Sequence, residues 1–295
     1  GEVMIRRRRD EAPGVHYMKR IPRIQSIELS PREKRAYDEV VDLLLSHYYD
    51  FKDNKINTVL AIHSILPKIT SSSRSSIEFL EKIISDPKYS ITTQNQAKKC
   101  LYNFQTLEED TKLNALIKTV EEILKTNKKD KILIYTRHPA TLKYIAETLR
   151  KRGLNLTELL GGLTSLEKTE RIREFSKKAQ IMISTDTGSE GLNFQFCSNI
   201  INYDLPWNPM TVEQRIGRLD RIGQKKNIKV YSLATKDTME EYIVDLIINK
   251  MCCIGLIMGE LPIILFSMGL DSVGRSGTIK IEERLLNAFI DSRNN

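Results

Sequence analysis

Residues 132–151 read I-L-I-Y-T-R-H-P-A-T-L-K-Y-I-A-E-T-L-R-K, a short apolar run followed by a longer segment of helical period. The run at 132–135 has the length and the apolar character of a buried β-strand. The segment at 141–151 predicts a helix directly after it. A strand that leads at once into a helix is the repeating unit of an α/β domain.

The same alternation continues on both sides of this stretch. Helices are predicted at 112–125 and, with a capped start, at 164–175, and strands at 181–184, 200–203 and 230–233. Short strands that alternate with amphipathic helices indicate a parallel sheet with helices on both faces, of the RecA-like or doubly wound kind. Ligands of such sheets bind beyond the carboxyl ends of the strands, so the loops after Tyr135, Ser184 and Tyr203 are the expected site of chemistry.

The part before residue 110 is predicted to be helical. S-P-R-E from Ser30 offers an N-cap, a Pro at the first helical position and a Glu three residues after the cap. Helical patterns follow at 59–69 and 77–84, inside a polar, Ser-rich stretch that runs from about 54 to 106.

Composition limits the class of protein. The 46 Lys and Arg against 38 Asp and Glu give a net charge of +8, which favours polyanionic partners. The 4 Cys form no C-x-x-C pair, which predicts a reducing, cytosolic compartment without structural zinc, and the 4 His form no metal constellation. A leading Gly suggests an excised segment, and no apolar run follows it that would indicate a signal or anchor.

Residues 251–270 are apolar except for Glu260, which leaves a membrane helix as an alternative to a packing helix. Glu260 and Pro262 divide the run into two short pieces, whereas a span needs about 20 uninterrupted residues. No membrane association is therefore expected.

The most informative segment is Q-R-I-G-R-L-D-R-I-G-Q at 214–224. Thr211 and Gln214 suggest a second capping box, so the segment is predicted to be helical, with Gln214, Arg218 and Arg221 on the face opposite Val212, Ile216 and Leu219. Two guanidiniums on one face could flank a phosphoryl group. The alternative is a solvated basic face with ordinary salt bridges, for instance through Asp220. That alternative must explain Gly217 and Gly223, since a Gly inside a helix costs about 1 kcal/mol.

This segment resembles motif VI of the Swi/Snf-type ATPases in helicase superfamily two. S-T-D-T-G-S-E-G-L-N-F at 184–194 resembles motif V, N-Y-D-L-P-W-N-P at 202–209 resembles the segment between the two motifs, and residues 131–136 fit the motif IV strand. These motif sequences are most similar to those of the RapA/HepA branch of the family, and the similarity extends over roughly residues 4–261. The resemblance implies a linker and helical protrusion at 1–109, a RecA-like lobe at 110–261 and a carboxyl-terminal brace at 262–295. Residues 279–290 could form an amphipathic helix in that last part.

The resemblance also implies roles for individual residues. Arg218 and Arg221 would be the catalytic arginine fingers, whose positive charge stabilises the γ-phosphoryl group of ATP in the transition state. Gln214, Gly188 and Glu190 would line the nucleotide. The nucleic-acid contacts would be Thr136, Arg137, Gly161, Gly162 and Thr185, with no metal ligand among the residues of this chain.

ATP and Mg would be bound mainly by the first RecA-like lobe of the family. No G-x-x-x-x-G-K-[ST] loop and no D-E-x-H string occur in this sequence, so we expect the chain alone to be inactive. The implied partners are double-stranded DNA, that first lobe and, as a candidate, RNA polymerase, in a nucleoid-associated, cytoplasmic protein.

Two alternatives of function stay open: an RNA helicase of the same superfamily, or a non-catalytic nucleic-acid-binding module. At residue level, Trp207 could stack on a base, although packing beneath motif VI is favoured. The arginines at 6–9 resemble the family's linker between lobes more than a nuclear-localisation patch.

Overall fold

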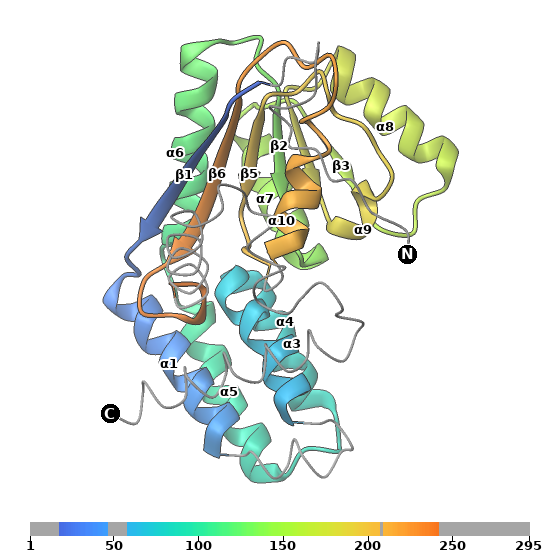
Figure 1. Cartoon of the computed structure of the whole chain (residues 1–295). Coiled ribbons are helices and arrows are strands. Elements are labelled where there is room, and N and C mark those ends of the chain that lie inside the picture. The colour runs from blue at the N-terminus through green and yellow to red at the C-terminus, as the bar shows by residue number, and fades with distance from the viewer. Residues whose placement is uncertain (1–17, 47–57, 207–208, 242–295) are drawn as a thin grey trace, which may run out of the picture.

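The computed structural model describes residues 18–46, 58–206 and 209–241. Its core is a six-stranded sheet in which every neighbouring pair is parallel, in the order β1-β6-β5-β2-β4-β3 (Figure 1). The strands are β1 (Arg20–Ile27), β2 (Ile132–Tyr135), β3 (Leu156–Leu159), β4 (Ile181–Ser184), β5 (Asn199–Asn202) and β6 (Ile228–Thr235).

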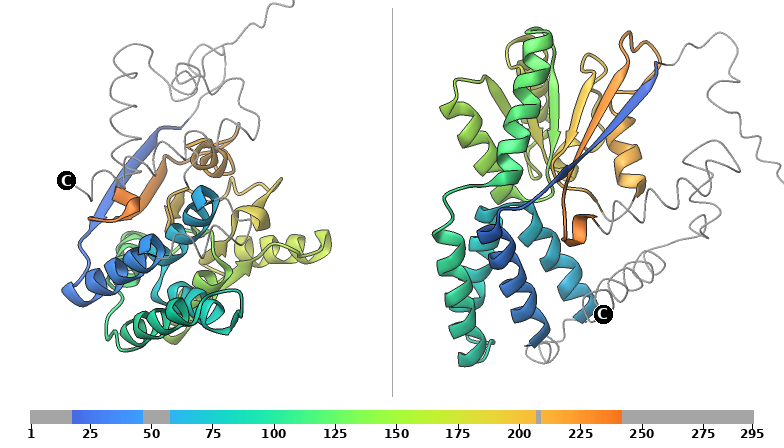
Figure 2. Two further views of the ribbon diagram at one scale, coloured as in Figure 1. Left: turned by 90° about the horizontal axis from the view of Figure 1, so that it is seen from below. Right: turned by 90° about the vertical axis from the view of Figure 1, so that its left-hand side faces the viewer.

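Helices cover both faces of this sheet. α6 (Thr111–Thr126) and α7 (Pro139–Lys151) pack on one face, where Ile134, Ile183 and Ile201 point. On the other face, Phe175 of α8 (Ser165–Lys177) and Ile216 of α10 (Pro209–Ile216) pack on β2, β4 and β5. Figure 2 shows α6 and α10 on opposite sides of the strands in its right-hand view. The α/β fold with a RecA-like parallel sheet is thus confirmed.

Local sequence explains where the helices begin. Thr164 and Glu167 form the capping box predicted for α8, with the Glu167 carboxylate 2.8 Å from the Thr164 amide. Asp110 caps α6 by accepting from the Leu113 amide at 2.9 Å, and Pro139 occupies the first turn of α7. The central strands are buried along their whole length, as expected between two helical layers.

A second helical group lies at the carboxyl edge of the sheet, below the strands in Figure 1. It contains α1 (Pro31–Ser46), α3 (Thr58–Ser71), α4 (Ser73–Ser85) and α5 (Ile91–Gln105), which enclose a separate apolar core. α1 starts with the predicted capping box, in which Glu33 accepts from the Ser30 amide at 2.8 Å. α3 and α4 confirm the helices predicted at 59–69 and 77–84, and α5 was not predicted.

The structure differs from the sequence prediction in two places that matter for the site. β1 was not predicted, and although it lies inside the range 1–109 it pairs with β6, so the helical protrusion cannot include it. In motif VI the helix begins at Pro209 rather than behind a Thr211 cap and ends at Ile216, so Arg218 and Arg221 are not helical. Gly217 and Gly223 therefore lie outside the helix, which removes the cost that they would carry inside it.

Several predictions lie outside the described residues. These are the arginines at 6–9, Trp207, the apolar run at 251–270, the brace at 262–295 and its helix at 279–290. Within the described ranges, no helix has the length and apolar character to cross a membrane, and no cluster of three or more potential ligand side chains is arranged for a metal.

Candidate nucleotide and nucleic-acid interface

The loops that carry the predicted nucleic-acid contacts each follow directly after one of three adjacent strands. β2, β4 and β3 are neighbours and end at Tyr135, Ser184 and Leu159, so the loops that start at 136, 185 and 160 meet at one edge of the sheet. Arg137, Gly161 and Gly162 are exposed there. The structure thus places Arg137, Gly161 and Gly162 on one surface.

The hydroxyl of Thr136 is not free to contact a ligand. Thr136 is fully buried, and its Oγ1 donates to Oδ2 of Asp204 at 2.5 Å. The same carboxylate oxygen accepts from the backbone amide of Arg137 at 2.9 Å. The predicted direct contact is therefore corrected for this side chain: Thr136 and Asp204 hold the loop that presents Arg137.

Thr185 likewise acts within the protein. It is buried, and its Oγ1 accepts from the Gly188 amide at 3.2 Å, which closes the short helix α9 (Asp186–Ser189). A Cβ on Gly188 would lie 2.2 Å from the backbone oxygen of Leu159, so only glycine permits this approach of motif V to the end of β3. Gly188 is thus a packing residue, and Glu190, just after α9, is exposed.

The main link between motifs V and VI is Arg215, which the sequence analysis did not assign. Its guanidinium is buried and pairs with both carboxylate oxygens of Asp186, at 2.7 and 2.9 Å. Nη1 also donates to Oδ1 of Asn202 at 2.9 Å and to the backbone oxygen of Asp204 at 3.0 Å, and the group lies 4.9 Å from the ring centre of Tyr135. Arg215 thereby joins α10 to the ends of β2, β4 and β5.

Further bonds fasten the loop that follows α10. The amide of Phe194 donates to the backbone oxygen of Arg218 at 2.9 Å. Gln224 is buried and its Nε2 donates to the backbone oxygens of Gln195 and Cys197, at 2.9 and 3.1 Å. Gln195 in turn donates to the backbone oxygen of Ile222. The end of motif V and the loop of motif VI therefore form one unit.

The side chains predicted to reach the nucleotide project from this fastened unit. Arg218 is half-buried, and among the described residues its guanidinium has neither an ion pair nor a hydrogen bond. Arg221 is exposed, and its Nε makes a long bond of 3.4 Å to the backbone oxygen of Gly217. Gln214 is exposed on α10. The salt-bridge alternative through Asp220 does not hold for either arginine, because Asp220 pairs instead with Arg20, at 2.6 Å.

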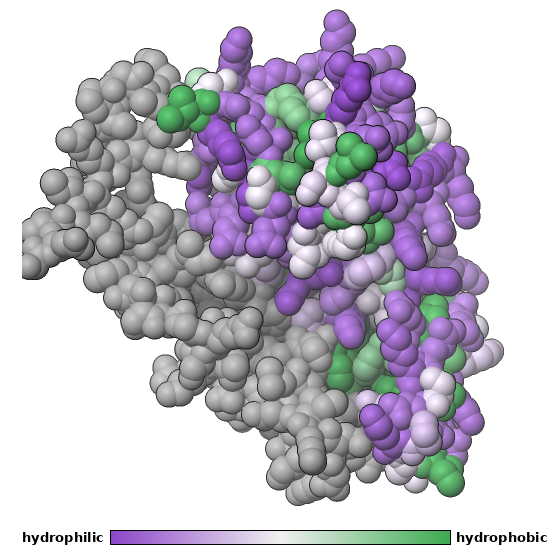
Figure 3. All heavy atoms as spheres, turned by 90° about the vertical axis from the view of Figure 1, so that its right-hand side faces the viewer, coloured by the Kyte–Doolittle hydropathy of each residue, from purple (hydrophilic) through white to green (hydrophobic). Residues whose placement is uncertain are grey.

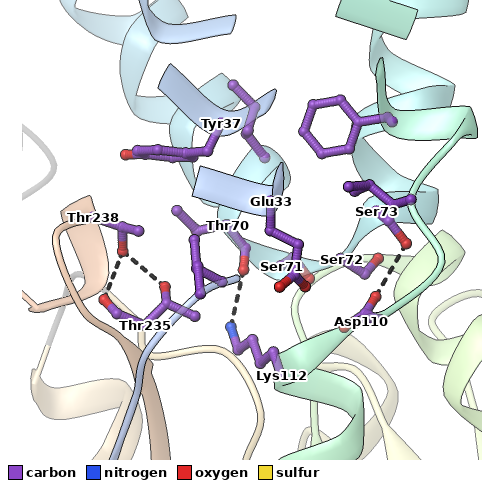
Figure 4. A pocket seen from close by; sticks show the side chains of 14 residues that line it. Glu33, Tyr37, Thr70, Ser71, Ser72, Ser73, Asp110, Lys112, Thr235 and Thr238 are labelled. Atoms are coloured by element: carbon purple, nitrogen blue, oxygen red, sulfur yellow. Dashed lines mark hydrogen bonds between the residues drawn. The ribbon is translucent and has the colours of Figure 1, made fainter. Parts of the chain in front are cut away.

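A buried ammonium joins the sheet to the helical group. Nζ of Lys112 lies 2.6 Å from Glu240, 3.4 Å from Asp204 and 3.1 Å from the backbone oxygen of Thr70, and 4.7 Å from the ring centre of Tyr203. Figure 4 shows Lys112 beside a cavity of about 50 Å³, which is lined by residues of the helical group and of the sheet domain. We call Lys112 and its partners Glu240, Asp204 and Thr70 the Lys112 centre. It holds Asp204, and through Asp204 the loop of Arg137, against the helical group.

Burial and this charge network shift several pKa values. Burial acts to raise the pKa of Asp204, but the Lys112 ammonium, His138 and the bonds from Thr136 and Arg137 outweigh it, so the pKa of Asp204 lies below its ordinary value. Burial lowers the pKa of His138, whose Nε2 has no hydrogen-bond partner among the described residues. Asp204 is therefore a carboxylate at neutral pH, suited to accept bonds from the loop.

More of the binding edge depends on residues that sequence reasoning missed. Asp186 and Asp204 are the single charged residues of S-T-D-T and N-Y-D-L, and that pattern could have identified them, since buried charges must be paired. Lys112 and Arg215 stand among other charged and polar residues, so no such signal marks them. Together these four residues orient an edge that combines exposed guanidiniums with glycine-lined loops, an arrangement suited to phosphate groups.

Comparison with known proteins agrees with this geometry. Residues 111–223 match the helicase conserved C-terminal domain. The chain is 34% identical, over 90% of its own length and 46% of the relative's, to an uncharacterized ATP-dependent helicase, YqhH, of Bacillus subtilis strain 168. It is 34% identical, over 51% of its length and 17% of the relative's, to the RNA polymerase-associated protein RapA of Vibrio campbellii. The chain therefore spans less than half the length of these relatives.

A solved structure of the Sulfolobus solfataricus SWI2/SNF2 ATPase core in complex with dsDNA has the same fold. The TM-score is 0.57 at 22% identity, over 90% of this chain and 48% of that one. Residues 111–223 thus match the helicase conserved C-terminal domain, and the chain shares its fold with a SWI2/SNF2 ATPase core, in agreement with the resemblance of its motifs.

Proposed function

We propose that this chain is the second motor lobe of a DNA-dependent ATPase that moves along double-stranded DNA and remodels protein–DNA complexes. Arg218 and Arg221 would act as arginine fingers on ATP held, with Mg²⁺, by a first RecA-like lobe. The chain contains no phosphate-binding loop sequence of its own, so hydrolysis requires that other lobe.

The observation that carries this proposal is the contrast between Arg218 and the residues that hold its loop. Arg215 is buried and bonded to four acceptor atoms, and the backbone oxygen of Arg218 is itself bonded to Phe194. The Arg218 guanidinium, however, has no partner among the described residues. A cation on a fixed backbone is arranged in advance to stabilise charge on a transferring phosphoryl group, an effect of roughly 10³ to 10⁵ in rate in other NTPases.

Gln214 and Glu190 are exposed side chains of the unit that motifs V and VI form, which supports their assignment as residues that contact the nucleotide. Gly188 would contribute by allowing the close packing beneath them rather than by touching ATP.

For DNA, the exposed groups of the carboxyl edge are Arg137, Gly161 and Gly162, and Gly162 has a φ of 85° that favours glycine. Contacts from a guanidinium and from loop amides would go to phosphates and be independent of sequence. Thr136 and Thr185 would position these loops. Double-stranded DNA is bound by the related SWI2/SNF2 core, and the name of RapA makes RNA polymerase a candidate partner. Such partners would place the protein at the nucleoid.

The test is ATP hydrolysis by the chain together with its amino-terminal lobe, with and without duplex DNA. We expect turnover that needs both lobes, is stimulated by DNA and falls by at least about 10³ in Arg218→Ala. Arg173→Ala, an exposed arginine on α8 without an ion pair among the described residues, is the matched control and should leave turnover unchanged. Full turnover in Arg218→Ala would refute the finger role, and no turnover with correctly folded lobes would favour a non-catalytic binding module.

A further inference from the structure

Pairs of consecutive basic residues precede four of the six strands. They stand at 128–129 before β2, 151–152 before β3, 177–178 before β4 and 225–226 before β6. Because all strands are parallel, the four loops meet at the amino edge of the sheet, opposite the edge that carries the Arg137 loop and motif V. We call this row of side chains the amino-edge row.

The row is continuous in space although it is dispersed in the sequence. In the sheet β3, β4 and β2 are neighbours and β6 follows after β5, whose own entrance carries Cys197 and Ser198 instead. At about 4.8 Å between strands, the row spans roughly 19 Å. That length corresponds to about five or six base pairs of a duplex at 3.4 Å each.

The side chains of the row are available to a partner. All eight are exposed. Arg152 pairs with Glu121 at 3.4 Å, and Lys226 pairs with Asp130 at 2.9 Å. For the remaining six lysines of the row, the described part of the chain supplies no ion pair. The edge therefore carries a positive charge that its own carboxylates do not balance.

Helix dipoles explain only half of the row. Cations are favourable near helix carboxyl ends, and this accounts for residues 151–152 at the end of α7 and 177–178 at the end of α8. Lys128 and Lys129, however, follow the end of α6 at Thr126, and Lys225 and Lys226 lie nine and ten residues after the end of α10 at Ile216. The dipole effect fades within the last turn, and within residues 18–46, 58–206 and 209–241 only Lys226 of these four has an ion pair, with Asp130, so Lys128, Lys129 and Lys225 need another explanation.

We propose that the amino-edge row is a second nucleic-acid-binding surface, which takes the phosphate backbone of a duplex independently of sequence. Lysines without carboxylate partners, spread along an edge, match the regular negative charge of a duplex. Lipid headgroups fit less well, because insertion into a membrane needs apolar side chains beside the cations. Three of the four loops expose no large apolar side chain, and Figure 3 shows mainly hydrophilic side chains at the top of the lobe.

This surface is distinct from the proposed DNA track, because the two lie at opposite edges of the sheet. A protein with both could hold two segments of DNA, or two parts of one bent segment, at once. The inference does not depend on hydrolysis, so it can stand or fall separately from the proposed function.

The experiment measures binding of this chain to a fluorescent 20-base-pair duplex by anisotropy, across a salt series. Lys177→Glu/Lys178→Glu and Lys128→Glu/Lys129→Glu are compared with Lys98→Glu/Lys99→Glu, an exposed consecutive lysine pair on α5 in the helical group, away from the amino edge. We expect each amino-edge variant to bind about tenfold or more weakly, with a salt slope smaller by about 1 to 2, and the α5 variant to change less than about twofold. Thermal melting verifies that all three fold.

An equal loss in the amino-edge and α5 variants would show an effect of net charge alone and overturn the proposal, as would wild-type binding in the amino-edge variants. Arg137→Glu separates the two surfaces. If binding depends on Arg137 and not on the row, the track stands and the second surface fails. If binding depends on the row and not on Arg137, the second surface stands and the proposed track fails.

Discussion

Arg20 and Asp220 are 200 positions apart in the sequence and form a 2.6 Å ion pair. Arg20 is the first residue of the edge strand β1, and Asp220 lies between the two proposed arginine fingers. The Asp220 side chain is 1% exposed, and the same guanidinium also binds Glu213 of α10 at 2.8 Å. The strand that enters the sheet from the amino-terminal side thus fixes the loop of motif VI.

The first prediction concerns Arg20→Ala. Removing a hydrogen bond to a charged, buried group should lower the free energy of unfolding by about 1.5 to 3 kcal/mol, measured by urea denaturation. In the two-lobe protein, ATP turnover should fall while affinity for duplex DNA is kept, because the variant loosens the finger loop and not the Arg137 loop. Arg20→Lys should restore part of both, and Arg23→Ala, in the middle of the same strand, is the control. Loss of stability with unchanged turnover would limit Arg20 to a structural role.

There is a physical reason why β1 was not predicted from the sequence. R-I-P-R-I-Q-S-I contains a Pro and only every third residue is Ile, so it shows neither the alternation nor the apolar run of a strand. As an edge strand, it is half-exposed, and its place depends on pairing with β6. The central strands β2, β4 and β5 show the opposite behaviour: each is buried on both faces, so burial alone requires the apolar run that identified them.

The second prediction concerns Arg215, which joins motifs V and VI. Arg215→Ala should destabilise the chain by about 3 to 5 kcal/mol in urea unfolding, because it leaves polar acceptors at the ends of β4 and β5 without their donor. Arg215→Lys should be nearly as harmful, since an ammonium cannot reproduce the planar pairing with Asp186 together with the bonds to Asn202 and Asp204. Arg173→Ala should change stability by less than about 0.5 kcal/mol. A mild effect of Arg215→Lys would show that charge rather than geometry joins the motifs.

The third prediction concerns the Lys112 centre. Lys112→Met leaves the buried carboxylates of Asp204 and Glu240 without their cation, so the free energy of unfolding should fall by roughly 3 to 5 kcal/mol. Adding Glu240→Gln to Lys112→Met removes one unpaired charge and should recover part of that loss. Lys118→Met, at an exposed position on the same helix, is the control. Additive effects of the two substitutions in a double-mutant cycle would contradict direct pairing.

The edge of the sheet that carries the candidate site could be predicted from the sequence, but the contacts that each side chain makes there could not. Motif resemblance and the rule for carboxyl ends led us to expect Arg137 and Gly161 in loops at this edge, where the structure has them, but Arg218 was expected on a helix and lies in the loop after α10. The hydroxyl of Thr136, expected to contact nucleic acid, is bonded to Asp204, a partner that lies just after β5 and 68 positions away in the sequence. Likewise, the helical spacing of apolar residues in 214–224 continues beyond Ile216, so the sequence gives no sign that the helix ends there. The reason lies in the hydrogen bonds that join the segment after Ile216 to residues 193–198.

The last prediction concerns pH. Burial lowers the pKa of His138 from its ordinary 6.5, with the nearby charges of Arg137 and Lys68 acting in the same direction and Asp204 against them. The neutral imidazole is thus favoured in the folded chain, and below pH 6.5 the unfolded chain binds more protons than the folded one. His138 should therefore contribute its full stability above that value and lose it as the pH falls towards the lower, folded-state pKa. Urea midpoints at pH 7.5 and pH 5.5 measure this, and the decrease should be larger in the wild type than in His138→Gln. Equal decreases in both would show that His138 is not the group that titrates.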